Sequence, residues 1–371
     1  MFRNWVTAGI INLIELGWVN DRLTRAGIRY LCRQRLNQVS NRDAETRQQK
    51  LQQFIAEAAN APIAPLAEKA NEQHYEIPAA FYDLVLGPQK KYSCCLYDRQ
   101  TNGLEQAETD ALQTTCERAE LRDGQDILEL GCGWGSLTLW MAEHYPNSKI
   151  TAISNSNSQR EHILGQAAFR GVGENLTVLT VDMNDFESEQ QFDRVVSVEM
   201  FEHMRNHQAL LSKVANWLRA DGKLFVHIFC HREFTYAFET EGSSNWMGRY
   251  FFTGGIMPSE SLFSNYEDDL KIAQQWTWNG KHYEQTSNHW LENLDQNRNQ
   301  VLSVLEDTYG RNQAKRWLNR WRVFFMACAE LFGADDGEQW YVAHYLFEKS
   351  KARSQMDLSN NSLAGPSGVP R

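Results

Sequence analysis

Two carboxylates and an imidazole follow one apolar stretch of the sequence. After FDRVVSV come the residues EMFEHM, which contain Glu199, Glu202 and His203. A carboxylate beside an imidazole can remove a proton from a bound substrate, because histidine titrates near neutral pH. Glu202 and His203 are therefore the candidate catalytic base, and Glu199 would attract a cation or orient His203. The alternative is structural, since acids at the start of a helix stabilise its dipole.

A second chemical signal is the bend ILELGCGWGSLTLW at residues 127–140, where glycines lie between two apolar runs. Glycines between a strand and a helix form a tight turn against which a ligand can lie. A dinucleotide-binding turn would read G-x-G-x-x-G, but Ser136 stands at the third glycine position and Asn155, not an acid, follows the next strand. S-adenosyl-L-methionine, which has no phosphate, fits this turn better than NAD.

The spacing E-x-G-x-G-x-G, which runs from Glu129 through Gly131 and Gly133, resembles the first motif of the class I methyltransferases. This resemblance implies an α/β, Rossmann-like sheet of seven strands with S-adenosyl-L-methionine as the cofactor. Glu129, Gly131 and Gly133 are accordingly candidate cofactor-binding residues.

Further cofactor contacts follow from the same resemblance. It implies that Asp182, with Met183 beside it, accepts a hydrogen bond from the adenine amine, and a carboxylate suits that donor. Asn155 and Gln159 would bind the ribose or the methionine carboxylate. The alternatives are that Asp182 is a turn residue and that Asn155 and Gln159 merely begin a helix.

Several longer motifs resemble the cyclopropane-fatty-acid-synthase-like methyltransferases and, within them, look most like the plant coclaurine N-methyltransferases. The motifs are HYEIPAAFYDLVLG (74–87), KYSCCLY (91–97), LELGCGWGSLTL, VEMFEHM (198–204), FVHIFCH (225–231), RYFFTGGIMPS (249–259) and WTWNGKHYEQTSNHWL (276–291). The resemblance implies that Tyr92 and Ser93 contact the cofactor and that EMFEHM lines the substrate side. A helical insertion at about 283–333 would cover the site.

Two reactions are known on this scaffold, cyclopropanation of an unsaturated acyl chain and methylation of an amine. The first depends on bound bicarbonate, and the resemblance places its ligands at Cys94, Glu202 and His227. However, the tyrosine expected near the late helix is absent, and Phe324 cannot replace its hydroxyl group. The synthases typically have glycine where this chain has Glu199.

The extra acid favours an amine substrate, because an ammonium ion must lose a proton before its nitrogen can attack a methyl group. We therefore expect N-methylation of a small amine that bears an aromatic ring, with cyclopropanation or carbon methylation of unsaturated acyl chains as the alternative. A catalytically inactive cofactor-binding scaffold is a third interpretation. Aromatic walls would suit a flat cation. The candidate substrate-contacting residues are Cys94, His227, Trp278, His282, Tyr283 and Phe324.

The elements that must position these residues begin near Asp126, where short β-rich runs alternate with helical stretches. This alternation predicts a parallel sheet with helices on both faces. A helical cap is expected over residues 1–70, packed on the main domain or, alternatively, on lipid, and the methyltransferase domain over 71–350. Residues 351–371, of which 359–371 are small, polar and rich in Gly and Pro, are expected to be a disordered tail or an appended segment.

The composition of the chain disfavours several classes of binding partner. The chain has 371 residues and a formal net charge of −10, which disfavours nucleic acid and anionic lipid. Its seven cysteines show neither metal-ligand spacing nor an even count, so we expect reduced thiols, no metal site and a cytoplasmic location. No apolar run is long enough to span a membrane, and no stable membrane association is expected. A homodimer is compatible with the sequence.

Overall fold

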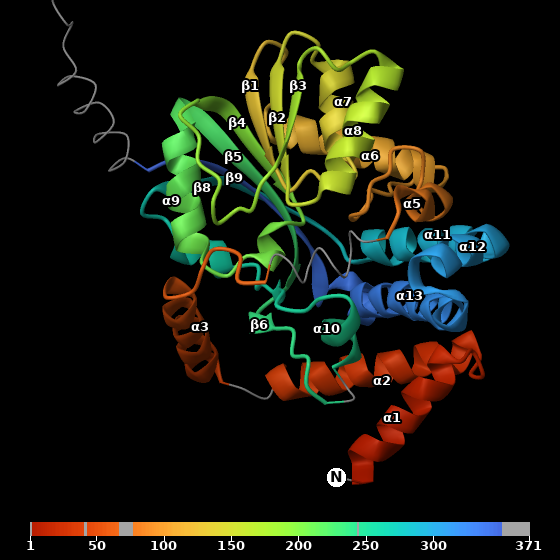
Figure 1. The fold of residues 1–371 in the computed structure, drawn as a ribbon. Coiled ribbons are helices and arrows are strands. Elements are labelled where there is room, and N and C mark those ends of the chain that lie inside the picture. Colours follow the sequence, from red (N-terminus) through yellow and green to blue (C-terminus); the bar gives the residue numbers. More distant parts are fainter. Residues whose placement is uncertain (1, 41–42, 67–76, 243–244, 351–371) are drawn as a thin grey trace, which may run out of the picture.

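The computed structural model describes residues 2–40, 43–66, 77–242 and 245–350. Its centre is one sheet of seven strands in the order β3-β2-β1-β4-β5-β9-β8, which Figure 1 shows in the upper part of the molecule. The strands are β1 (Asp126–Leu130), β2 (Lys149–Ser154), β3 (Leu176–Thr180), β4 (Phe192–Val198), β5 (Leu218–His231), β8 (Leu270–Trp278) and β9 (Trp340–Lys349).

Five of these strands run parallel, as the alternating sequence pattern predicts. The prediction of a parallel sheet is wrong for the last two strands, because β9 pairs antiparallel with both β5 and β8. The chain leaves β8 into the helical insertion and returns from it into β9, so the two strands form a long hairpin. We did not predict β8, whose central residues are polar and largely exposed.

Helices flank the sheet in the manner of an α/β fold. They are α5 (Ala79–Val85), α6 (Gly103–Arg118), α7 (Ser136–His144), α8 (Asn157–Arg170) and α9 (His207–Trp217). Helices α7 and α8 contact β2 and β3, whereas α9 contacts β5 and β8 at the other side of the sheet. Shorter elements complete the sheet domain: β6 (Tyr236–Ala237), α10 (Trp246–Tyr250), β7 (Ile256–Met257), and the 3₁₀ turns η1 (Phe201–His203), η2 (Leu262–Asn265) and η3 (Ala334–Gly337).

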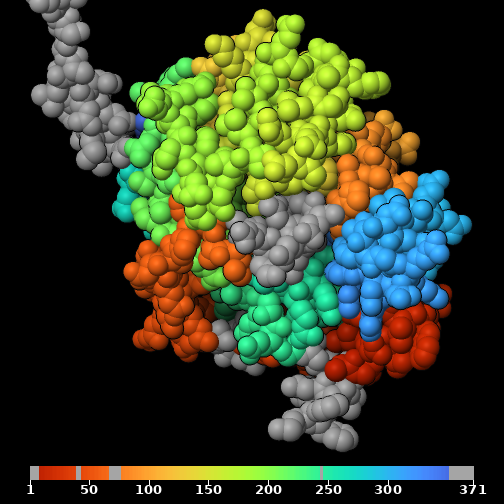
Figure 2. Space-filling view, viewed as in Figure 1, coloured from red at the N-terminus to blue at the C-terminus, as the bar shows by residue number. Residues whose placement is uncertain are grey.

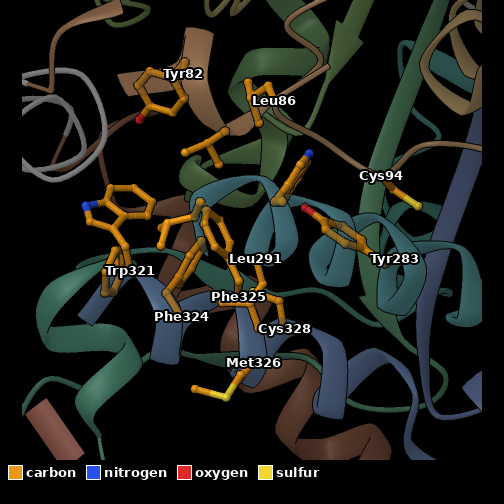
Figure 3. Close-up of a cluster of buried hydrophobic side chains, with 14 of the residues drawn as sticks. Tyr82, Leu86, Cys94, Tyr283, Leu291, Trp321, Phe324, Phe325, Met326 and Cys328 are labelled. Carbon is orange, nitrogen blue, oxygen red and sulfur yellow. The ribbon is translucent and has the colours of Figure 1, made fainter. Parts of the chain in front are cut away.

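The predicted helical insertion consists of α11 (Lys281–Gln296), α12 (Arg298–Tyr309) and α13 (Arg311–Phe332). Its core is aromatic: in Figure 3 the side chains of Trp321, Phe324 and Phe325 of α13 lie together, and Tyr283 of α11 lies at the other side of the same cluster. Trp321 and Phe325 are completely buried, and Phe324 stacks on Phe251 with ring centroids 4.3 Å apart. Since each large aromatic side chain removes much apolar area from water, this cluster holds the insertion as one rigid roof.

The N-terminal helices are α1 (Phe2–Glu15), α2 (Asp21–Ser40) and α3 (Ala44–Ala59). Helices α1 and α2 pack on α13 of the insertion, and α3 packs on α9 (Figure 1). Figure 2 shows the red surface of the N-terminal helices directly beneath the blue surface of the insertion. Buried Glu15 joins the two, because it accepts hydrogen bonds from Arg316, Arg320 and Trp246. The cap therefore braces the insertion.

Two predictions fall outside the described residues, namely the domain boundary at residue 70 and the nature of the segment 351–371. Within the described ranges, no helix has both the length and the apolar character needed to cross a bilayer.

Candidate functional site

The glycine bend lies at the carboxyl end of β1. Gly131, Gly133 and Gly135 all have positive φ angles (79°, 51° and 86°), a conformation that is costly for residues with a Cβ atom. The Gly131 and Cys132 amides donate to the Ile153 carbonyl at the end of β2, which closes the turn. A Cβ atom on Gly131 would lie 2.6 Å from Cγ of Met200. The bend therefore needs glycine for both backbone and space.

A cavity of about 210 Å³ opens beside this bend, between the carboxyl ends of the strands and the helical insertion. Open α/β sheets bind ligands at this position. Among the predicted site residues, those that line the cavity are Tyr92, Ser93, Glu129, Gly131, Gly133, Asn155, Gln159, Met183, Glu199, His203, Tyr283 and Phe324. Those that do not line it are Asp182, Cys94, Glu202, His227, Trp278 and His282.

Three buried donors on the cavity wall suit a polar ligand. Nε2 of Gln159, Nε1 of Trp134 and Oγ of Ser136 have no hydrogen-bond partner among the described residues. Gln159 is fixed in place because its Oε1 accepts from Ser154 Oγ at 2.6 Å. Buried polar groups are costly unless they are paired, so these atoms fit the carboxylate and hydroxyl groups of S-adenosyl-L-methionine. Ser156, not Asn155, caps α8, and it accepts from the Gln159 amide.

Glu129 supplies the acidic wall on the cofactor side. Its Oε2 accepts a hydrogen bond from Thr138 Oγ1 at 2.5 Å, and burial raises the pKa of the carboxyl to about 7. Asp182, by contrast, forms a local turn: its Oδ1 accepts from the backbone and side-chain nitrogens of Asn184. Met183 lines the cavity, whereas Asp182 does not. The contact of Asp182 with the adenine amine therefore stays a prediction.

Glu199 follows β4 directly and has a φ angle of 49°. This left-handed conformation is uncommon for a residue with a side chain. Three donors hold its carboxylate: the Cys94 amide at 3.0 Å, His227 Nε2 at 3.2 Å and Tyr283 Oη at 2.7 Å. The hydrogen bonds offset the backbone strain and aim a carboxylate at the cavity.

Glu202 and His203 lie in the turn η1, which is too short to provide a helix dipole. Glu202 is completely buried behind the cavity wall, where its Oε1 accepts from the Phe229 amide at 2.7 Å. Burial and the neighbouring Glu199 raise the pKa of Glu202 well above its usual range. The pKa of Glu199 is also raised by burial, but the charge of Lys91 and hydrogen bonds from the Cys94 amide and Tyr283 oppose that effect. Because two such close carboxyls resist double ionisation, Glu202 holds the proton and Glu199 carries the charge.

His203 lines the cavity and lies parallel to the Phe252 ring, with the two centroids 5.7 Å apart. Burial lowers the pKa of its imidazole to about 4. The side chain is therefore neutral at physiological pH and can accept a proton. The sequence pattern placed the base at Glu202 and His203, whereas the structure brings Glu199 and His203 to the cavity.

The other predicted substrate contacts lie behind the wall. Cys94 is completely buried, and burial raises the pKa of its thiol, which excludes an easily formed thiolate. Nδ1 of His282 accepts from the Tyr97 amide. Trp278 packs its ring against His227 and His344. The described residues contain no cluster of ligands that could hold a metal ion.

Sequence reasoning missed several residues of the wall. Lys91 is a buried lysine whose Nζ donates to Ser93 Oγ and to the Cys94 carbonyl. Its place beside Tyr92 in KYSCCLY could have revealed it. Aromatic residues from separate segments complete the wall. Trp134, Phe229, Phe252 and Trp290 lie within the motifs quoted above, whereas Phe238 and Phe332 lie outside them and carry no comparable local signal.

The family model of mycolic acid cyclopropane synthetases matches residues 65–341. The chain belongs to this family. Its members are S-adenosylmethionine-dependent methyltransferases, and so is this protein. The match spans the glycine bend, the whole helical insertion and every strand of the sheet except most of β9.

Individual relatives agree with the family assignment. An (S)-coclaurine N-methyltransferase of Thalictrum flavum subsp. glaucum is 36% identical over 344 residues, which are 92% of this chain and 95% of that protein. A crystal structure of coclaurine N-methyltransferase bound to N-methylheliamine and SAH is 34% identical, with a TM-score of 0.88 over 92% of this chain and 99% of that one. A cyclopropane synthase of Mycobacterium tuberculosis (20% identity, TM-score 0.63, covering 76% and 98%) shares the fold.

Proposed function

We propose that this methyltransferase acts on the nitrogen of a small amine that bears an aromatic ring. The observation that carries the proposal is Glu199, a buried carboxylate that opens onto a cavity with aromatic walls. A protonated amine is attracted by such a charge and by the faces of aromatic rings. The names of the relatives support the proposal, because an (S)-coclaurine and a pavine N-methyltransferase are 36% and 33% identical.

The alternative, cyclopropanation with bicarbonate, has less support. Two of its expected ligand positions are Cys94 and His227, but the Cys94 amide and His227 Nε2 both donate to Oε1 of Glu199. The carboxylate of the chain itself thus occupies donors that an external anion would need. Phe324 also lines the cavity without a hydroxyl group.

Different residues have different roles in the proposed methyl transfer. When bound, S-adenosylmethionine supplies an activated methyl group on a positive sulfur. Glu199 holds the incoming ammonium, and the neutral imidazole of His203 takes one proton from it, which frees the nitrogen lone pair. The cofactor would supply the methyl group, its S–C bond breaking as the N–C bond forms and the electron pair staying on sulfur, and the donors of Gln159, Trp134 and Ser136 would hold it. The roof formed by α11 and α13 excludes water and holds the nitrogen in line.

The test is an assay with labelled S-adenosylmethionine and separate substrates: tetrahydroisoquinolines, phenethylamines and unsaturated phospholipid vesicles, each with and without bicarbonate. We expect one added methyl group on an amine, at a rate that does not depend on bicarbonate. Methylated lipid that requires bicarbonate would support the alternative instead. Tight binding of adenosylhomocysteine without turnover of any substrate would indicate an inactive scaffold.

A further inference from the structure

A continuous chain of hydrogen bonds runs from Glu199 through two histidines of the sheet to an arginine on α6. His227 Nε2 contacts Glu199 Oε1 at 3.2 Å, and His227 Nδ1 contacts His344 Nε2 at 2.9 Å. Nδ1 of His344 then contacts Nη1 of Arg118 at 2.8 Å. Both histidines are completely buried, and neither they nor Arg118 line the cavity. The substrate site is therefore connected to an arginine that it does not touch.

The arginine at one end sets the direction of every hydrogen bond. A guanidinium group only donates, so Nδ1 of His344 must accept and its proton must lie on Nε2. That proton is donated to Nδ1 of His227, which places the proton of His227 on Nε2. His227 consequently donates to Glu199. Any other tautomer would set two protons or two lone pairs against each other.

The charges around the chain agree with this direction. Burial lowers the pKa of both imidazoles well below the usual range, and the positive charges of Arg118 and Lys91 lower it further. The two histidines therefore remain neutral, with one proton each. Glu199 also faces the neutral His203, and the charge of Lys91 together with the Cys94 amide favours its charged form.

The fold builds this arrangement into rigid elements. His227 on β5 and His344 on β9 are directly opposite each other in the antiparallel register. Arg118, in the last turn of α6, lies over the rings of Trp276 and Trp278 at 5.2 and 5.5 Å. The Trp278 ring packs edge-on against both histidines. The sheet register and the two tryptophans thus keep the three donors aligned.

We propose that Arg118 and His344 are positioning residues for the methyl transfer, which act through His227 to keep Glu199 ionised and directed at the amine. The inference rests on the proposed function, since it assigns these residues to the same carboxylate. Neither residue contacts the cavity, and neither figured among the sequence-based candidates.

The first test observes the tautomers in the full-length, substrate-free protein. Histidines are labelled with ¹⁵N, and the imidazole signals of His227 and His344 are identified by their loss in His227→Gln and His344→Gln. Both residues should carry a single proton on Nε2. A proton on Nδ1 of His227, or a doubly protonated ring near neutral pH, would overturn the proposal whether or not any amine is methylated.

The second test is kinetic and compares Arg118→Leu with Arg118→Lys. Without the donor, the pKa of Glu199 should rise, so the acid limb of kcat/KM should move to higher pH by about one unit. KM for the amine should rise roughly tenfold, while kcat changes less. Lysine restores a charged donor and should recover most of the loss. Adenosylhomocysteine affinity should stay the same in both variants.

Arg194→Leu is the matched control, because Arg194 is a half-buried arginine on β4 that bonds to the Ala119 carbonyl and Glu120 outside the chain of histidines. Arg194→Leu should change neither KM for the amine nor the acid limb of the kcat/KM pH profile. If Arg118→Leu also left both unchanged, the positioning role would be refuted. If the wild-type protein methylated no amine, the proposed function would fail, while the tautomer measurement would still decide the hydrogen-bond direction.

Discussion

The two sides of the cavity are built in different ways. The side that we propose for the cofactor is made mainly by one short stretch of chain, the bend after β1, together with the start of α8. The side that we propose for the amine takes Glu199 from the end of β4, Tyr283 from α11 and Phe324 from α13. One side is formed by backbone conformation within a local motif, whereas the other exists only after distant segments have packed together.

The two sides also differ in charge. On the proposed cofactor side, the buried donors of Gln159, Trp134 and Ser136 have no hydrogen-bond partner among the described residues, and they suit acceptor groups of a ligand. On the amine side, Glu199 presents a negative charge that is stabilised from behind by donors. Buried donors on one side of the cavity and a carboxylate on the other would separate the cofactor from a cationic substrate. Changes on one side should therefore leave binding on the other side intact.

The largest expected effect is on turnover. Glu199→Gln keeps the size of the side chain but removes the charge, and amine turnover should fall about 100-fold or more. Glu202→Gln should retain most activity, because Glu202 already holds a proton. Binding of adenosylhomocysteine, measured by calorimetry, should stay within about twofold of wild type in both variants. Equal losses of turnover in the two variants would contradict the assignment of charge.

Glu199→Gly extends the same test. Glycine accepts the φ angle of 49° without strain and leaves the Cys94 amide and His227 Nε2 without their acceptor. Added formate or bicarbonate should enter that space and restore part of the lost activity. If neither anion raised the rate of Glu199→Gly above that of Glu199→Gln, the site would not be the anion position that we infer.

A change in the bend should affect cofactor binding instead. Gly131→Ala places a Cβ atom against Met200 at a φ angle of 79°, and the affinity for adenosylhomocysteine should fall roughly tenfold or more. Gly171→Ala is the control, since Gly171 has a φ angle of 71° with open space around it and lies outside the cavity. It should lose similar backbone stability but keep cofactor affinity, as titration calorimetry would show.

A comparison of His207 and His203 distinguishes an effect on folding stability from an effect on the reaction. His207 is buried outside the cavity, and burial lowers its pKa to about 4. Below about pH 6.5 the unfolded chain binds a proton that folded His207 cannot, so its contribution to stability falls as pH falls from about 6.5 toward 4. Between pH 7 and 5 the stability of wild type relative to His207→Gln should drop by about 2 kcal/mol in urea unfolding.

His203 shares this low pKa but lines the cavity. His203→Ala should reduce turnover about 100-fold at pH 7, whereas His207→Gln should leave turnover per folded molecule unchanged. A normal rate in His203→Ala would exclude the imidazole as the proton acceptor.

The smallest effect is expected at the roof. Phe324→Leu keeps an apolar wall but removes an aromatic face, so KM for the amine should rise about fivefold, in line with a cation–π contact of roughly 1 kcal/mol. Leu331→Ala, on the same helix and the same cavity wall, removes no aromatic ring and should change KM less. Similar KM values for the two variants would argue against ring contact with the cation.

The sequence was informative where function follows from local conformation. The bend from Glu129 to Gly135 could be interpreted directly, because glycine at positive φ angles is a property of neighbouring residues. The parallel strands β1 to β5 and the helical insertion were predictable from alternating and periodic apolar patterns. Strand β8 was not, because its polar residues show no such pattern and it is held by pairing with β9.

The roles of the residues in EMFEHM show most clearly what could not be predicted from the sequence. From residue types alone, Glu202 and His203 were an obvious pair, and Glu199 was an accessory. Burial and hydrogen-bond donors decide which carboxyl is charged, and these donors come from Cys94, His227 and Tyr283 in three distant segments.

The amino-acid order alone thus determined the family, the cofactor and the chemical groups available, since these depend on short motifs and backbone preferences. Tertiary structure alone decided which acid faces the cavity, which imidazole can accept a proton, and that Arg118 is linked to the site through two histidines. The physical reason is that charge state and tautomer depend on desolvation and on contacts between residues far apart in the chain, and neither is encoded in any single stretch.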